Sequence, residues 1–317
     1  MAEEHPEDAK RSGRSIRQSD AGRSPWDDPL DADRLAASTG PYPHQSTSAG
    51  SPSRARVALS TSTVYPETTA SAFELASGLG YDAVELMVGV DPVSADIDYV
   101  CKLQDYHQVA VASIHAPCLL VTQNIWGTEP WGKLRRSCEA ARRLGAGVVV
   151  VHPPFRWQRE YAAGFTAGIA DLSGMTGITI AVENMYPWRA PGTGFGFQAY
   201  APNWDPTPLA LDALTLDLSH AATARLRSMD YVTAWGPRLR HVHLTDGSGS
   251  LRDEHLLPGQ GDQDAWAVVD RLAVDGYSGY IVHEFNTRRA ESRADRERVL
   301  AEALAETRTH LVTAHAD

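Results

Sequence analysis

A short segment near the C-terminal third of the chain combines several side chains that bind metal ions. It runs from His241-Val-His243 to Asp246, and a loop rich in glycine and serine then leads to Asp253-Glu-His255. Imidazole nitrogens and carboxylate oxygens are ligands that zinc and other divalent ions take in proteins. An apolar strand that ends in histidine, followed by an Asp-x-His loop, can direct several such atoms to one point. The spacing therefore predicts a local metal site.

Residues of the same types end six consecutive apolar segments, which we interpret as β-strands. They are His115, His152, Glu183, Asp217, His243 and Glu284. Side chains two residues apart share a strand face, so Glu183 and Asp217 fall on one face while Val182 and Leu216 fall on the other. A single residue of this kind is more often a helix cap or hydrogen-bond anchor. Converging carboxylates, however, repel each other without a cation, so the set predicts a divalent metal site. His220, three residues after Asp217, could reach the same site.

These strands belong to a repeating order in which a short β-branched segment is followed by a longer segment of helical pattern. The predicted strands cover residues 57–60, 83–86, 111–115, 148–152, 179–183, 214–218, 240–244 and 280–284. Among the predicted helices are residues 69–79, 133–144, 221–235, 265–272 and 293–312. Eight βα units in a row predict an α/β fold, the (β/α)8 TIM barrel, with a doubly wound open sheet as the alternative. In a barrel the strand ends meet on the face that carries function.

Composition divides the chain into two parts. Its 317 residues, 43% hydrophobic and 22% charged, can build one large barrel. Residues 1–54 are rich in Ser, Pro, Gly, Asp and Arg and have few residues that could form a core. Such a segment buries too little apolar surface to offset chain entropy. We therefore expect a disordered tail over residues 1–54 and a barrel over residues 55–317.

Charge and cysteine content bear on partners and location. The formal net charge of −11 opposes the counterion release on which nucleic-acid binding depends, so a nucleic-acid partner is not expected. The chain has no apolar stretch long enough for a membrane span and no secretory signal pattern, which predicts a cytoplasmic protein without a membrane partner. Cys101, Cys118 and Cys138 lack a CxxC spacing and are expected to be small buried apolar residues. A homo-oligomer is compatible with exposed barrel helices.

The motifs taken together resemble the xylose-isomerase-like TIM-barrel superfamily over residues 57–310. The matching segments are His115-Ala-Pro, Val151-His-Pro-Pro, Val182-Glu-Asn-Met, Leu216-Asp-Leu-Ser-His220, His243-Leu-Thr-Asp246, Asp253-Glu-His255 and His283-Glu. This superfamily contains sugar and sugar-phosphate isomerases and epimerases, together with the endonuclease IV group of abasic-site nucleases. The resemblance implies the same barrel fold that the strand order predicts.

The resemblance implies two chemistries. In the isomerases and epimerases, one divalent ion (Mn, Mg, Co or Zn) is held by a quartet that matches Glu183, Asp217, His243 and Glu284. Glu183 and Glu284 would then also be the catalytic residues, moving a proton next to a metal-bound carbonyl. The endonuclease IV group uses two to three Zn ions, and its further ligands match His115, His152, His220, Asp253 and His255. Every position of this larger ligand set is occupied by a matching residue, so a multinuclear zinc phosphohydrolase is the alternative. A metal-containing binding protein is a third interpretation.

Basic and aromatic side chains in the predicted loops are candidates for substrate binding. Arg156, Arg189 and Arg288 could bind a phosphate or carboxylate group, although each could equally form a surface ion pair. Trp157 and Trp188 could cover the face of a sugar or pack within their own loops. The acidic charge and these tryptophans favour a small sugar or sugar phosphate as the partner, and therefore the isomerase or epimerase.

Overall fold

The computed structural model describes residues 55–89, 91–189 and 196–313. The predicted disordered tail, residues 1–54, lies outside the described residues. The described residues belong to one unit of internal contacts, Gly50–Asp317. Within these ranges no helix is both long enough and apolar enough to cross a membrane.

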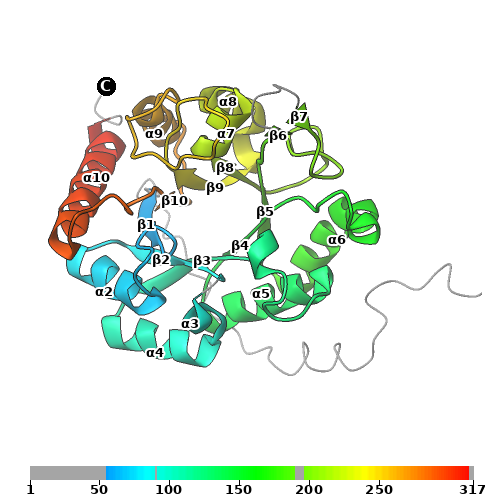
Figure 1. The fold of residues 1–317 in the computed structure, drawn as a ribbon, viewed down its shortest axis with the longest axis horizontal. Helices are drawn as coiled ribbons and strands as arrows, with labels where there is room; N and C mark the ends of the chain where they lie inside the picture. The colour runs from blue at the N-terminus through cyan, green and yellow to red at the C-terminus, as the bar shows by residue number, and fades with distance from the viewer. Residues whose placement is uncertain (1–54, 90, 190–195, 314–317) are drawn as a thin grey trace, which may run out of the picture. The chain divides into compact units, whose positions relative to one another are not determined.

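Eight parallel strands close into a barrel (Figure 1). They are β1 (Arg56–Ser60), β2 (Ala83–Met87), β3 (Ala110–His115), β4 (Val148–Val151), β5 (Thr179–Glu183), β8 (Leu214–Asp217), β9 (Leu239–Leu244) and β10 (Tyr280–His283). The order around the barrel is β1-β10-β9-β8-β5-β4-β3-β2. Strand β1 pairs with both β10 and β2, so the sheet has no free edge. The predicted (β/α)8 barrel is confirmed, and the open sheet is excluded.

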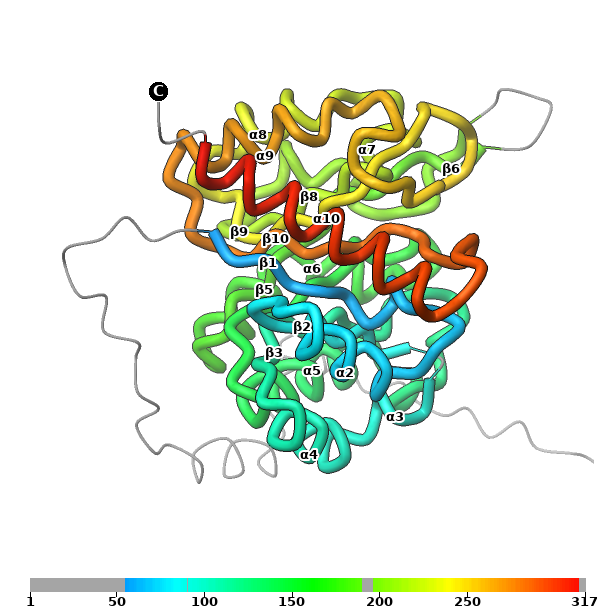
Figure 2. The backbone as a smooth tube through the Cα atoms, turned by 90° about the vertical axis from the view of Figure 1, so that its left-hand side faces the viewer, coloured from blue at the N-terminus to red at the C-terminus, as the bar shows by residue number. Residues whose placement is uncertain are grey.

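Helices surround this barrel. They are α2 (Thr69–Leu79), α3 (Pro92–Ala95), α4 (Ile97–His107), α5 (Pro130–Leu144), α6 (Arg159–Thr176), α7 (Leu218–Ala224), α8 (Ser228–Trp235), α9 (Ala265–Val274) and α10 (Arg293–Thr313). Helix α10 packs against both α9 and α2 and so joins the last unit to the first (Figures 1 and 2). The prediction of one helix over residues 221–235 was wrong. Arg225 takes a left-handed φ of 60°, which ends α7 before α8 begins.

Helix α2 illustrates how the local sequence sets these elements. The Thr68 side chain accepts a hydrogen bond from the Ser71 N–H and so caps the first turn. Gly80 ends the helix at a φ of 80°, a conformation that suits glycine. The face of α2 that contains Phe73 and Ala76 is buried against the barrel, which stabilises the helix more than its propensity does.

The barrel interior contains an apolar cluster as well as the polar strand ends. Ala58, Ala83, Ala112 and Val282 form this buried cluster. The C-terminal ends of the strands carry the acids and histidines, and the register places Asp217 of β8 beside His243 of β9. The prediction that these residues share the interior face therefore agrees with the strand pairing.

Candidate metal centre

All the predicted ligand residues meet at the C-terminal end of the barrel. They come from β3, β5, β8, β9, the start of α7 and the loops after β4, β9 and β10. Seven of them are buried, and Asp253 and His255 are half-buried. Their side chains form three neighbouring groups, which we call the rim group, the central group and the loop group.

The rim group contains His115, His152 and one oxygen of Glu183. Glu183 Oε2 lies 3.2 Å from His115 Nε2 and 3.0 Å from His152 Nε2. The other ring nitrogen of His115 lies 3.2 Å from the Ala116 carbonyl oxygen, a contact that favours a proton on Nδ1. Nε2 is then free to act as a ligand.

The central group contains the quartet implied by the isomerases. His243 Nδ1 lies 2.8 Å from Glu284 Oε2, 3.2 Å from Glu183 Oε1 and 3.6 Å from Asp217 Oδ2. Carboxylates from three different strand ends thus surround a single imidazole nitrogen. Donor atoms at such separations are close to the spacing that a divalent ion requires.

The loop group contains His220, Asp253 and His255. Asp253 Oδ2 lies 3.2 Å from His220 Nε2 and 3.0 Å from His255 Nε2. His255 has a left-handed φ of 45°, a strained conformation for a residue with a Cβ and one that is common at functional sites. His220 also lies 3.2 Å from Glu183 Oε1, so the loop group adjoins the central group.

The loop after β9 is held in place by hydrogen bonds from two anchors. Ser219 Oγ donates to Asp253 Oδ1 at 2.6 Å and accepts the His255 N–H at 3.0 Å. Asp246, which the sequence placed beside the ligand motif, instead accepts backbone N–H groups from Gly259 at 2.9 Å and Gln263 at 3.1 Å. Asp246 therefore organises the loop that presents the loop group.

The residues present fit a bound cation. Among the described residues, the buried side-chain atoms without a hydrogen-bond partner include Asp217 Oδ2 and Glu284 Oε2. A buried carboxylate oxygen without a partner is costly, and both atoms face the same imidazole nitrogen. A divalent ion bound between them would satisfy both, and zinc accepts this set of oxygen and nitrogen donors.

Without an ion, protons balance the charge of these groups. Burial favours the neutral form of Glu183, but His243 and His152 outweigh it and hold the pKa of the carboxyl well below its usual range. Burial also opposes charge on His152, but Cys118 and Glu183 raise its pKa to about 9. Burial likewise opposes charge on His255, and Asp253 is the largest influence that raises its pKa, to about 10. A metal ion entering the site must therefore displace protons.

Glu85 of β2 is a member of the site that sequence reasoning missed. Its side chain is fully buried beneath the central group, where Oε1 lies 3.1 Å from His243 Nε2. Oε2 lies 2.7 Å from His241 Nε2 and accepts a hydrogen bond of 2.7 Å from Ser113. The prediction of His241 as an interior, hydrogen-bonded histidine is confirmed. The signal for Glu85 was an acid on the inward face of a short apolar strand.

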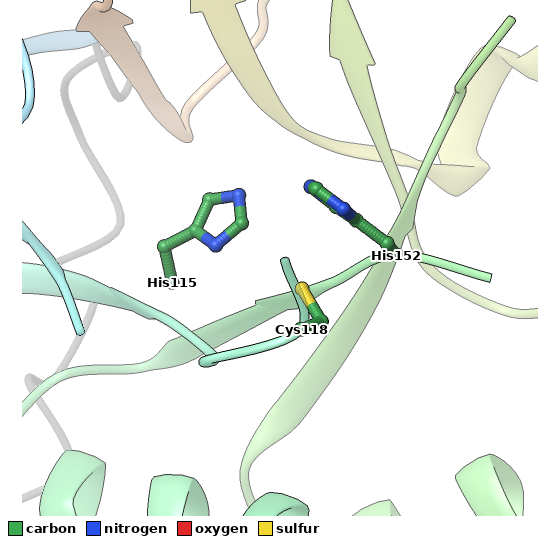
Figure 3. Close-up of side chains that lie close together, drawn as sticks. All are labelled: His115, Cys118 and His152. Carbon is green, nitrogen blue, oxygen red and sulfur yellow. The ribbon is translucent and has the colours of Figure 1, made fainter. Parts of the chain in front are cut away.

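Cys118 is the second residue that was missed. The expectation of a buried apolar residue holds for Cys138 but is wrong for Cys101 and Cys118, which are half-buried. Cys118 lies beside the rim group (Figure 3). Burial disfavours its thiolate, but His152 and His115 outweigh it and lower the pKa of Cys118 to about 5. The described cysteines are free thiols, in agreement with the absence of a disulfide pattern.

A pocket of about 510 Å³ opens over the three groups. His115, His152, Glu183 and Glu284 form part of its floor, and Arg288 and Tyr65 lie on its wall. Arg288 is the one Lys or Arg side chain among the described lining residues. Its guanidinium lies 4.5 Å from the centre of the Tyr65 ring. The pocket therefore has the size for a small molecule and offers one side-chain cation to an anionic group.

The other predicted substrate-binding residues do not line this pocket. Trp157 stacks on Phe155, with ring centres 4.5 Å apart, and Trp188 packs against the same ring. Arg156 donates to the Gln198 carbonyl at 3.3 Å, and Arg189 lies in the hairpin of β6 (Trp188–Arg189) and β7 (Gly196–Phe197). Part of the predicted loop, residues 190–195, lies outside the described residues. A role for these four side chains in substrate binding stays a prediction.

Comparison with known proteins identifies relatives of this chain. An uncharacterised protein of Mycobacterium tuberculosis is 48% identical over 274 residues, which cover 81% of this chain and 98% of that protein. An uncharacterised protein of Mycobacterium leprae is 46% identical over the same length. The chain covers almost the whole of these relatives.

Solved structures share the fold at low identity. An L-ribulose 3-epimerase is 19% identical, with a TM-score of 0.52 and 83% of this chain and 96% of that chain covered. An AP endonuclease of family 2 from Brucella melitensis is 18% identical, with a TM-score of 0.56 and coverage of 79% and 98%. The IOLI protein, crystallised with a bound zinc atom, is 16% identical, with a TM-score of 0.52 and coverage of 82% and 97%.

A family model agrees with the geometry of the barrel and its strand ends. The model described as the xylose isomerase-like TIM barrel matches residues 73–310. This range includes every residue of the rim, central and loop groups. The chain belongs to the xylose isomerase-like TIM-barrel family.

Proposed function

We propose that this protein is a divalent-metal-dependent isomerase or epimerase of a sugar or sugar phosphate. The observation that best supports this proposal is the position of Glu183 and Glu284. Both line the floor of a pocket of small-molecule size, and both face His243 Nδ1. The epimerase among the structural neighbours and the zinc-containing neighbour support this proposal. A single Mn, Mg, Co or Zn ion in the central group is the implied cofactor.

In this proposal Asp217, His243, Glu183 and Glu284 hold the ion. The bound ion would polarise a carbonyl group of the substrate and acidify the neighbouring C–H. Glu183 and Glu284 then serve as the acid–base pair, one removing the proton and the other returning it. Ser62 Oγ donates to Glu284 Oε1 at 3.1 Å and orients that carboxylate. Arg288 binds the substrate phosphate or carboxylate at the pocket wall.

Proton exchange into substrate tests this function. Metal-loaded protein is incubated in D2O with a panel of aldoses, ketoses and their phosphates, and deuterium next to the carbonyl is measured by mass spectrometry. We expect exchange with at least one sugar, its loss in Glu284→Gln, and its retention in Glu254→Gln, a lining carboxylate outside the three groups. Absence of exchange across the panel, with metal bound, contradicts the proposal.

A multinuclear zinc phosphohydrolase is the second candidate, because the rim and loop groups adjoin the central group. Five further donors lie next to the quartet, and Glu183 faces both His115 and His220. Two or three zinc ions bound this way could activate water for attack on a phosphodiester. Nucleic-acid binding requires several cationic side chains to neutralise phosphate groups. Arg288 is the one arginine or lysine among the described residues that line the pocket, which gives little support for binding a nucleic-acid backbone.

Metal counting separates the two candidates. A metal content little changed in His255→Ala supports the isomerase or epimerase, because neither uses the loop group. Loss of a zinc ion in His255→Ala supports the hydrolase, which should then cleave an abasic-site duplex at low salt. Metal binding without either reaction supports the third interpretation, a binding protein. A cytoplasmic location and a homo-oligomer stay predictions, to be checked by fractionation and light scattering.

A further inference from the structure

The Cys118 thiol lies beside two imidazoles that the one-ion isomerase does not use. Figure 3 shows its sulfur pointing toward the gap between the rings of His115 and His152. One ligand atom from each of the three side chains lies within 4.8 Å of the other two. Glu183 Oε2 lies 3.2 and 3.0 Å from the two imidazoles. The sulfur therefore lies close to both imidazoles, and a Glu183 oxygen lies against the same two rings.

The backbone that carries Cys118 is held firmly. Lys133 of α5 is buried and donates from Nζ to the carbonyl groups of Pro117 at 3.4 Å and Thr122 at 3.1 Å. These bonds tie both sides of the Cys118 loop to the helix. The position of the Cys118 side chain is therefore set by the fold.

The present contact of the thiol is weak and replaceable. Cys118 Sγ donates to the Ala116 carbonyl at 3.1 Å, while the Cys118 N–H donates to the same oxygen at 2.8 Å. A thiol is a weak donor, and the carbonyl keeps its backbone bond when the sulfur turns away. On the other ring of the group, His152 Nδ1 is buried and has no hydrogen-bond partner among the described residues. The rim group is thus not satisfied by hydrogen bonds alone.

We propose that Cys118 is a metal ligand and that it binds a zinc ion together with His115 and His152. The inference rests on the proposed metal dependence of the site, and this ion is additional to the one in the central group. The thiol proton leaves to solvent as the thiolate binds. A thiolate among the donors selects zinc or cobalt over magnesium and manganese, which prefer oxygen. Glu183 Oε2, shared by both imidazoles, can complete a tetrahedral set.

Cys118 borders a second cavity. The residue is half-buried, and the cavity has a volume of about 80 Å³ and is lined in part by Lys133, Gln158 and Tyr161. Cys101 on α4 is likewise half-buried but lies outside the three groups. Cys101 is therefore a matched control within the same molecule.

Cobalt spectroscopy tests the sulfur–metal bond directly. Apo protein is titrated with Co²⁺, and absorption is recorded for the wild type, Cys118→Ser and Cys101→Ser. We expect the thiolate-to-cobalt charge-transfer band in the wild type and Cys101→Ser, and its loss in Cys118→Ser. Circular dichroism checks that Cys118→Ser is folded. Cobalt bound without this band in the wild type, or a band that persists in folded Cys118→Ser, overturns the inference.

Alkylation gives a second readout that does not depend on activity or on a variant. Wild-type protein is treated with iodoacetamide with and without Zn²⁺, and each cysteine is quantified by mass spectrometry. We expect zinc to protect Cys118 and to leave Cys101 unchanged. Equal modification of Cys118 with zinc bound overturns the inference. Failure of any metal to bind would defeat the proposed function as well, whereas binding without sulfur contact defeats the Cys118 ligand alone.

Discussion

Glu183 is the residue on which the three groups converge. Its Oε2 faces His115 and His152, and its Oε1 faces His220 and His243. A single buried carboxylate therefore links every group of the site. Any ion in one group changes the charge that the other groups experience.

Glu85 is expected to act through His243, because its carboxylate meets the ring nitrogen opposite the central group. Hydrogen-bond partners of metal-binding histidines orient the ring, and their loss costs about 10- to 100-fold in metal affinity. Glu85→Gln should therefore weaken metal binding by this factor in a competition titration with a chelator dye. Ser113→Ala, which removes a different partner of Glu85, should change affinity little. Equal affinities in Glu85→Gln and wild type would refute this positioning role.

Metal binding should release protons, because the imidazoles are charged in the metal-free protein. The pKa values of His152, about 9, and His255, about 10, lie above the usual 6.5. In the metal-free protein, the charged forms of these two histidines stabilise the folded state. This contribution is fully present below pH 6.5 and is lost as pH rises through 9 to 10. Burial also opposes charge on His243 of the central group, but Glu284 and Glu85 hold its pKa well above the usual value. At neutral pH, an ion bound by these histidines must displace their protons, so calorimetry with Zn²⁺ in buffers of different ionisation enthalpy should show net proton release. The same binding enthalpy in every buffer would contradict this expectation.

At the scale of elements, the loop between β9 and α9 depends on Asp246. Its carboxylate accepts N–H groups from Gly247, Gly259 and Gln263 at 2.8, 2.9 and 3.1 Å. Each buried donor left without an acceptor costs about 1 to 3 kcal/mol. Asp246→Ala should therefore lower the free energy of unfolding by at least about 2 kcal/mol in urea.

A nearby acid provides the control for this loop. Asp262 is exposed, so Asp262→Ala should change the free energy of unfolding by no more than about 0.5 kcal/mol. Asp246→Ala should also lower the occupancy of the loop group, because Asp253 and His255 lie on the same loop. An unchanged urea midpoint in Asp246→Ala would show that the loop is held by other contacts.

At the scale of the whole molecule, metal removal should reduce stability. An ion that binds only the folded chain stabilises it by about 2.7 kcal/mol at 100 times its dissociation constant. Treatment with EDTA should therefore lower the thermal unfolding midpoint, and added Zn²⁺ should restore it. The test compares differential scanning calorimetry of metal-loaded, EDTA-treated and reloaded protein. Identical midpoints in the three samples would argue against an ion bound to the native barrel.

Removal of residues 1–54 tests the proposed boundary of the barrel. Strand β1 begins at Arg56 and pairs with β10 and β2, so a chain of residues 55–317 keeps every barrel strand. We expect this shortened protein to keep the urea midpoint and the metal content of the full chain. A lower midpoint would show that the N-terminal residues contribute to the fold.

Much of the fold and the ligand set could be predicted from sequence. Each predicted strand has a counterpart in the barrel. The spacing of apolar residues along a strand and the residue types in turns are local properties, and tertiary contacts did not change the elements that they predict. The predicted ligands, such as His115 and Glu284, converge because parallel strands of a barrel end on one face. The break between α7 and α8 was not predicted, since Arg225 in a left-handed conformation has no sequence signal comparable to glycine.

Other features were decided only by tertiary structure. Glu85 belongs to the site because barrel closure brings β2 across the interior from β9, a relation that no local pattern encodes. Cys118 lies between two imidazoles because Lys133 fixes a loop whose path the sequence does not reveal. The substrate pocket likewise depends on the packing of distant loops, which placed Arg288 on its wall and directed Trp157 onto Phe155. Local sequence determines which residues end a strand, whereas contacts between distant segments determine which side chains share a site.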